Sequence, residues 1–335
     1  MKQSIKIQLI SVLVVGMIIG LGVYPFIFPA YDELGPAMGT GFFVSDDGCI
    51  VTNAHVVEYS EIMGNNKVLI RLPIDIPEER GGDDIKYHSD HMYYKYGEIL
   101  KIGWADGGDW DGGGIIDDLA LIKIYDDSPI FFLDEDGIEV ETNLAFSPVP
   151  VTINTNTPQG EDGALAIGHP GIQSVHLGYW IPTVGWFAEI NRNTNEYIFE
   201  VPTFTGNSGG PVLNLDGELV GVVWGGASYE VFEDEEGEEV AWGFPYNNMH
   251  LNEIYQTEII DWSNLGWFLF DTGATDTFAE RSTTVIEFLE GTPCNIKTST
   301  STPMRFSEEE YDKELEQLAK IFEEAKYKVV SVEEI

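Results

Sequence analysis

The chain has few cysteines, and this shortage limits the sites it can build. Only two of its 335 residues are cysteines, Cys49 and Cys294. Two thiols are too few for a cysteine-based zinc site or for a disulfide framework. They could pair with each other in an oxidising compartment, or they could be two separate buried thiols.

Basic residues are also scarce. The chain has 17 Lys and Arg against 57 Asp and Glu, which gives a formal net charge of −40 at pH 7. Binding to nucleic acid through a basic patch is therefore not expected. Repulsion among so many like charges destabilises the folded protein, and salt relieves it by screening. The charge therefore suggests a saline habitat. An acidic surface that only promotes solubility is the alternative.

Charge of either sign is absent from Ile7 to Tyr31. The run approaches the roughly 20 apolar residues that cross a bilayer, so residues 1–31 are predicted to form a transmembrane anchor. Lys2 and Lys6 precede the run and Asp32 follows it, so the body of the chain is predicted to lie outside the cytoplasm. A cleaved signal peptide is the alternative, with its nearest candidate site at 35–37.

Three segments carry the residues of a nucleophilic site. Thr205 to Pro211 reads TGNSGGP, in which Ser208 stands at a glycine-rich turn. Gly39 to Val57 reads GTGFFVSDDGCIVTNAHVV and is predicted to be a β-hairpin that leads to His55. Asp117 to Ile124 reads DDLALIKI, an extended run that begins with two carboxylates.

This chain order supplies the three groups that serine chemistry needs. A serine hydroxyl is a weak nucleophile that needs a histidine base, and the base needs a carboxylate to hold its tautomer. A Gly/Asn/Ser turn alone is more often a plain hairpin. The other histidines are expected to be structural: His88, His91, His169, His176 and His250.

The strings GTGFFV, TNAHVV, DLALIK, AIGHPG, GNSGGP and LDGELVGVVWGG occur in order over residues 38 to 247. This set resembles the chymotrypsin-fold serine proteases, and most closely the HtrA/DegP type. The resemblance implies that His55 is the general base, Asp118 the orienting carboxylate and Ser208 the nucleophile, with Gly206 and Ser208 donating the oxyanion-hole N–H groups. Asp118 is preferred to Asp117 because it directly precedes LALIK and because adjacent strand residues face opposite sides.

The resemblance implies a mainly β fold with two six-stranded antiparallel β-barrels, over 32–140 and 141–250. Residues 251–335 depart from the family pattern, since no PDZ domain is recognisable there, and they are expected to form an extension. Ser307 to Tyr327 is predicted to be an amphipathic helix that begins with a capping box of Ser307 and Glu310. That helix is expected to dock on its own barrel, with oligomerisation as the alternative.

By the same resemblance, the pocket for the side chain before the scissile bond is lined by neutral residues. Without a buried carboxylate, the pocket is expected to accept a small or medium apolar side chain rather than Lys or Arg. The expected substrate-binding residues are Pro202, Thr203, Phe204, Thr205, Val223, Trp224, Gly225 and Gly243.

Two acidic segments have open interpretations. Asp106 to Gly114 reads DGGDWDGGG, which could bind calcium but matches no EF-hand spacing, so a surface loop is preferred and no metal site is expected. Glu230 to Glu239 reads EVFEDEEGEE, which could attract basic substrates but is more simply a solvated hairpin.

The sequence thus predicts a membrane-anchored, extracytoplasmic serine endopeptidase that needs no cofactor. The resemblance implies damaged or unfolded polypeptides as substrates and trimers as the assembly. A non-catalytic or latent binding or chaperone module and a dedicated processing protease are the alternatives.

Overall fold

The structure is a computed structural model of the chain. It describes residues 38–58, 60, 64–74, 92–103, 118–134, 137–169, 171–172, 175–176, 180–191, 195–201, 203, 206–233, 239–243, 275–305 and 311–334. Within them, no helix has both the length and the apolar character that a membrane span needs. The predicted anchor over 1–31, the segment 106–114 and the capping box of Ser307 and Glu310 lie outside the described residues.

Six antiparallel strands close into a first barrel, because β3 pairs with β4 as well as with β19. In order around the barrel they are β3 (Lys67–Arg71), β19 (Val329–Glu334), β1 (Met38–Phe43), β2 (Cys49–Thr52), β5 (Ala120–Ile124) and β4 (Tyr94–Ile102). β-branched and aromatic side chains such as Phe43, Ile50, Ile70, Ile122 and Val330 fill its interior. These residue types favour strands because they pack well on a pleated surface. A hairpin of β6 (Ile130–Leu133) and β7 (Glu139–Thr142) extends this sheet from β4.

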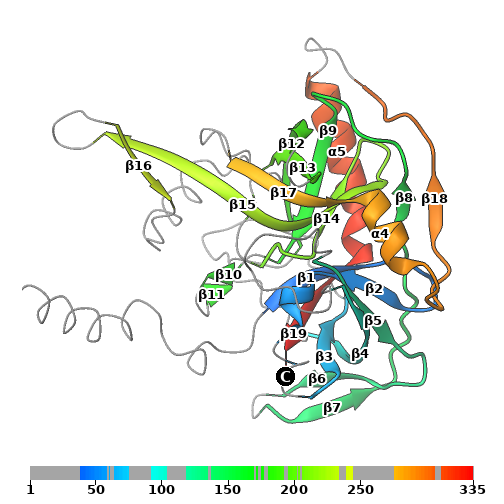
Figure 1. Ribbon diagram of the computed structural model, residues 1–335. Helices are drawn as coiled ribbons and strands as arrows, with labels where there is room; N and C mark the ends of the chain where they lie inside the picture. Colours follow the sequence, from blue (N-terminus) through cyan, green and yellow to red (C-terminus); the bar gives the residue numbers. More distant parts are fainter. Residues whose placement is uncertain are drawn as a thin grey trace, which may run out of the picture. The chain divides into compact units, whose positions relative to one another are not determined.

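The sixth strand of the first barrel comes from the far end of the chain. β19 pairs antiparallel with β1, with Thr40 opposite Ser331 and Gly41 opposite Val330, and Figure 1 shows it beside β1. Its four leading residues, VVSV, are all buried. The sequence analysis did not predict this strand.

A second barrel also closes with six antiparallel strands, because β14 pairs with both β9 and β15. In order they are β14 (Pro211–Leu213), β9 (Gly163–Gly168), β12 (Ile181–Ile190), β13 (Tyr197–Glu200), β17 (Thr275–Arg281) and β15 (Leu219–Glu233). Phe187, Tyr197 and Phe199 meet edge to face in its core. The predicted mainly β fold with two six-stranded barrels is therefore confirmed, although β17 also comes from the region expected to form an extension.

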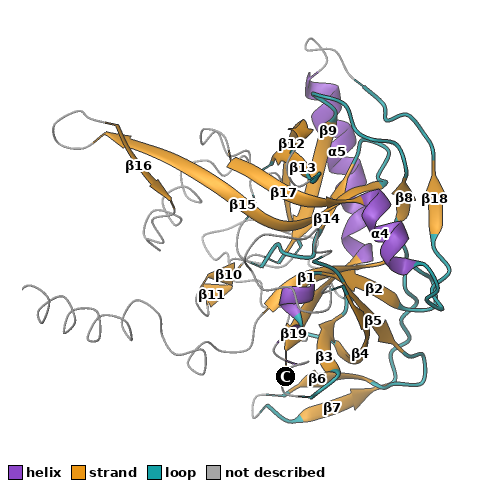
Figure 2. Cartoon of the chain, viewed as in Figure 1, coloured by secondary structure: helices purple, strands orange, loops and turns teal. Residues whose placement is uncertain are grey.

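The described residues also form shorter elements around the barrels (Figure 2). They are β8 (Thr152–Asn154), β10 (Gly171–Ile172), β11 (Val175–His176), β16 (Glu239–Gly243), β18 (Lys297–Ser299), the helices α4 (Ser282–Leu289) and α5 (Tyr311–Ala325), and the 3₁₀ helices η2 (Ala54–Val56) and η4 (Lys326–Lys328). β15 runs past the barrel and pairs with β16 as a long hairpin, with Glu233 opposite Glu239.

The two C-terminal helices belong to the largest apolar cluster. α5 lies within the range predicted for a helix, and its buried stripe of Leu318, Ile321 and Phe322 packs with residues of both barrels, including Phe42 and Leu165. The helix therefore docks on its own barrels, as expected, rather than leaving this stripe exposed.

A disulfide joins Cys49 to Cys294, whose Cα atoms are 6.0 Å apart. Cys49 is the first residue of β2 and is fully buried, while Cys294 follows α4. The bond ties the segment after α4 to the strand that leads to His55. Of the two alternatives left by the sequence, the structure has the paired one.

Candidate active site

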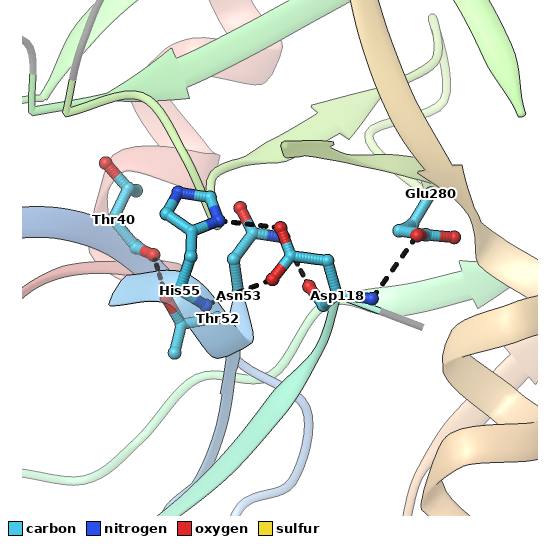
Figure 3. A network of polar contacts seen from close by, with 6 residues as sticks. All are labelled: Thr40, Thr52, Asn53, His55, Asp118 and Glu280. Carbon is cyan, nitrogen blue, oxygen red and sulfur yellow. Dashed lines mark hydrogen bonds and ion pairs between the residues drawn. The ribbon is translucent and has the colours of Figure 1, made fainter. Parts of the chain in front are cut away.

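His55 and Asp118 are in contact at the end of the first barrel (Figure 3). β2 ends at Thr52, and η2 then carries His55, while Asp118 lies just before β5. The ring Nδ1 of His55 is 2.6 Å from Asp118 Oδ2, and the backbone N–H of His55 donates to Asp118 Oδ1 at 3.0 Å. Because an ionised carboxylate only accepts hydrogen bonds, Nδ1 carries the proton in this contact. Nε2 is then the basic nitrogen of the neutral ring.

Two further contacts hold the backbone of Asp118. Asn53 Nδ2 donates to the Asp118 carbonyl at 2.6 Å, and the Asp118 N–H donates to Glu280 Oε1 at 3.4 Å. Glu280 belongs to β17 of the second barrel and is 7% exposed. The Asp118 backbone is thus linked to both barrels. The sequence analysis missed Asn53 and Glu280, and only Asn53, inside the TNAHVV string, gave a signal that could have drawn attention to it.

The turn that carries Ser208 is held by backbone hydrogen bonds to β15. Gly209 N–H donates to the Val223 carbonyl at 2.7 Å, and Val223 N–H donates to the Gly210 carbonyl at 2.9 Å. Gly206 and Gly209 have φ of +94° and +82°, in the left-handed region that glycine adopts at little cost. A Cβ on Gly209 would lie 2.1 Å from the Thr40 carbonyl oxygen. The turn therefore needs glycine both for its backbone angles and for its close approach to β1.

Ser208 and the segment of His55 meet against β1. The N–H of Thr40 donates to the Ser208 carbonyl at 2.8 Å. A Cβ on Gly39 would lie 2.6 Å from Val56, the neighbour of His55, and 3.1 Å from the Ser208 carbonyl oxygen. Within the described parts of the chain, no hydrogen bond joins Ser208 to His55. In ligand-free enzymes such contacts are often long and tighten only when substrate binds.

The family model for the trypsin-like peptidase domain matches residues 39–222. The chain belongs to this family.

Curated relatives of this trypsin-like peptidase domain protein are named as HtrA and DegP proteases. This chain is 30% identical to a probable periplasmic serine endoprotease, DegP-like, from Chlamydia muridarum. The aligned 203 residues cover 58% of this chain and 29% of the relative. This chain is 26% identical to the protein of the same name from Halomonas elongata, and the alignment covers 57% of this chain and 30% of the relative. It is 27% identical to the mouse serine protease HTRA4, over 60% of this chain and 33% of the relative. The chain thus spans about a third of the length of these relatives.

Two of the predicted substrate-binding residues, Thr203 and Trp224, contact β17 through their side chains. Thr277 donates its hydroxyl proton to the Val201 carbonyl, so the 2.7 Å contact between the Thr203 and Thr277 hydroxyls has Thr203 as donor. The Trp224 ring stacks on Phe278, with ring centroids 5.7 Å apart. In this trypsin-like domain, β17 therefore supports two of the residues predicted to line the substrate site.

The other predicted substrate-binding residues fall into two groups. Val223 and Gly225 lie on β15, Val223 is buried, and Gly243 pairs with Tyr229 in the β15–β16 hairpin. The remaining ones lie outside the described residues, as does Asp117: Pro202, Phe204 and Thr205. Among the residues that the structure describes, no group of three or more His, Cys, Asp or Glu is arranged to hold a metal ion.

Proposed function

We propose that the protein is a serine endopeptidase that cleaves peptide bonds through an acyl-enzyme. His55 is the general base, Asp118 orients it, and Ser208 is the nucleophile. The proposal rests chiefly on the double hydrogen bond between His55 and Asp118, which leaves Nε2 of His55 free of the proton. Membership of the trypsin-like peptidase family and the protease names of its relatives support the same activity.

The proposed chemistry begins when Ser208 Oγ attacks the substrate carbonyl carbon and its proton passes to His55 Nε2. The Gly206 and Ser208 N–H groups donate to the oxyanion that forms. His55 then gives the proton to the leaving amine, and the C–N bond breaks to leave an ester on Ser208. His55 next takes a proton from water, which attacks the ester carbon. The bond to Ser208 Oγ breaks, His55 returns the proton to Oγ, and the acid product leaves. Throughout, Asp118 stabilises the imidazolium form of His55.

The test is labelling of the purified full chain, in mild detergent, with a fluorophosphonate that reacts only with activated serines. The wild type is expected to label, and Ser208→Ala and His55→Ala are expected not to. Folded wild type that remains unlabelled in both low and high salt would point to the rival function, a latent protease or a binding module that retains the protease fold.

We propose that the residue before the cleaved bond is small or medium in size and apolar. Thr203, Val223, Trp224 and Gly225 are uncharged. Among the residues that the structure describes, no atom lies within 4 Å of a Cβ placed on Gly225, which is consistent with space for a side chain there. A neutral pocket does not compensate the desolvation of Lys or Arg. Profiling with a peptide library checks this, and cleavage mainly after Lys or Arg would contradict it.

We further propose that the protein acts outside the cytoplasm on damaged or unfolded polypeptides, held to the membrane by residues 1–31. The uncharged run from Ile7 to Tyr31 supports the anchor, and the word "periplasmic" in the names of relatives supports the location. Digestion of denatured casein separates this role from that of a dedicated processing protease, which would leave casein intact. Sedimentation of the full chain in detergent tests for the trimer that the family resemblance suggests.

A further inference from the structure

Thr40 of β1 is hydrogen-bonded to two carbonyl groups of the turn that carries Ser208. Its N–H donates to the Ser208 carbonyl at 2.8 Å and its Oγ1 donates to the Gly206 carbonyl at 2.6 Å. The side chain is fully buried. These contacts cross from the first barrel to the second. We propose that Thr40 is the positioning residue for the oxyanion-hole N–H groups of Gly206 and Ser208, an inference that rests on the proposed function.

The Thr40 hydroxyl has only one proton, and its neighbours determine where that proton goes. Gly206 O can only accept, so Thr40 Oγ1 is the donor in that contact. On the other side, the backbone N–H of His169 donates to Oγ1 at 3.0 Å, and His169 Nδ1 lies 3.3 Å from Oγ1. Because Thr40 Oγ1 donates its only proton to Gly206 O, His169 Nδ1 can hydrogen-bond to Oγ1 only as a donor. The His169 ring is itself set edge-on against Trp180, with centroids 5.1 Å apart.

The Gly206 carbonyl shares a peptide plane with the Asn207 N–H, and the Ser208 carbonyl shares one with the Gly209 N–H. Holding both carbonyls therefore holds the two peptide planes on either side of the 207–208 peptide that carries the Ser208 N–H, and it holds the carbonyl end of Gly206. Gly206 has φ of +94°, and a glycine visits many other backbone conformations when nothing holds it. An oxyanion hole works because its donors are already aimed before charge develops, so rotation of this turn would weaken catalysis without removing any reacting group. The hydroxyl of Thr40 makes a side-chain contact that opposes such rotation at Gly206.

Thr40 is held firmly enough for this role. Its carbonyl accepts a hydrogen bond from Thr52 Oγ1 at 2.6 Å, and β1 lies between β2 and β19, with Thr40 opposite Ser331. Thr52 ends the strand that leads to His55. Thr40 therefore connects the strand of the proposed base to the turn of the proposed nucleophile.

The test compares three variants with the wild type, using a peptide amide substrate and a peptide boronate that mimics the tetrahedral intermediate. Thr40→Val keeps the side-chain shape and the backbone bond to Ser208 but removes the hydroxyl. It is expected to lower kcat by about 10- to 100-fold, somewhat less than the loss of an oxyanion donor, with KM within about twofold. Boronate affinity should fall in parallel with kcat/KM, because only the anionic adduct uses the hole. Thr40→Ser should recover most of the activity.

Thr183→Val is the matched control, since Thr183 is a buried threonine of β12 whose hydroxyl has no partner among the described residues. It should leave kcat, KM and boronate affinity unchanged. A merely structural role for Thr40 would lower thermal stability with kcat intact in the folded fraction, and that result overturns the inference. If Thr40→Val does not fold, Thr40→Ala is measured in the same way.

Hydrogen exchange separates failure of this inference from failure of the proposed function. Thr40→Val should speed exchange of the Gly209 and Gly210 amides by at least about tenfold relative to Thr183→Val, whether or not the protein is active. Unchanged exchange and unchanged kcat overturn the role of Thr40 while an active wild type keeps the protease assignment. Thr40→Val could exchange faster while the wild type never reacts with the fluorophosphonate. That result would overturn the protease assignment and, with it, the catalytic consequence drawn for Thr40.

Discussion

Asp118 accepts two hydrogen bonds from the same residue, His55, one from its backbone N–H at 3.0 Å and one from its ring Nδ1 at 2.6 Å. The first fixes where the carboxylate lies relative to η2, and the second fixes the ring. The imidazole therefore has one orientation and one tautomer without help from Ser208. Its side chain is 31% exposed, and that of Asp118 is 16% exposed.

Asp118→Asn should abolish most activity while the fold remains. The amide oxygen still accepts from the His55 N–H, but the amide NH₂ faces Nδ1 and favours the tautomer with the proton on Nε2. That tautomer cannot accept the Ser208 proton, and we expect kcat to fall by about 10⁴-fold, as the general triad mechanism implies. Steady-state kinetics on a peptide amide measure this. Asp117→Asn is the control, and a larger loss there than at Asp118 would show that the neighbouring carboxylate has the orienting role.

The Cys49–Cys294 disulfide should make a large contribution to stability. It closes a loop with a sequence separation of 245 residues, and native disulfides of small domains typically contribute about 2 to 5 kcal/mol. Cys294→Ser is expected to lower the free energy of unfolding by an amount in that range, measured by denaturant titration. Cys294 is the better site for substitution because Cys49 is fully buried.

Reductant supplies the control for the disulfide. Dithiothreitol should lower the stability of the wild type to that of Cys294→Ser and should leave the variant unchanged. If reductant affects both proteins equally, or neither, the two cysteines are not paired in solution.

The segments of the candidate site were predictable because their signals are local. Glycines mark the Ser208 turn, whose backbone angles and contacts only glycine allows, and two apolar runs on either side of the turn signal SDDG mark the hairpin before His55. The family resemblance that these strings carried is confirmed by the match over 39–222.

The pairing partners were not predictable, because they come from distant parts of the chain. β19 follows a helix near the C-terminus and completes the barrel beside β1, where Thr40 lies opposite Ser331. An alternating or apolar run predicts a strand but does not say which strand lies beside it. The same limit explains why the contacts of Glu280 with Asp118 and of Thr40 with Gly206 were missed. The division into segments 32–140, 141–250 and 251–335 stays a prediction.

Asp216, in the turn between β14 and β15, should make the protein less stable as the pH rises. Asp216 is an exposed residue, but partial desolvation of its carboxylate, with repulsion from Glu218, raises the pKa of Asp216 above its ordinary value of 3.8. As pH rises past that value, the unfolded chain loses its proton before the folded chain does, so folding becomes less favourable until the folded pKa is passed. Asp216→Asn removes this effect and keeps a residue suited to the turn. Its melting temperature should exceed that of the wild type at pH 7.5 and match it near pH 3.

Asp46→Asn is the control for Asp216, since Asp46 is an exposed turn residue of the hairpin between β1 and β2. It removes the same formal charge from an exposed turn that has no Glu218 beside it. An equal gain in melting temperature for both variants at pH 7.5 would attribute the effect to net charge alone.

The net charge of −40 should make thermal stability depend strongly on salt. The Debye length falls from about 30 Å at 0.01 M salt to about 10 Å at 0.1 M and 3 Å at 1 M. If repulsion is the cause, most of the rise in melting temperature should occur below about 0.3 M NaCl, where that length changes most. Stabilisation by solute exclusion instead increases steadily into the molar range, and sucrose, which does not screen charge, reproduces it. A melting temperature that does not change with NaCl would show that the acidic surface serves solubility rather than adaptation to salt.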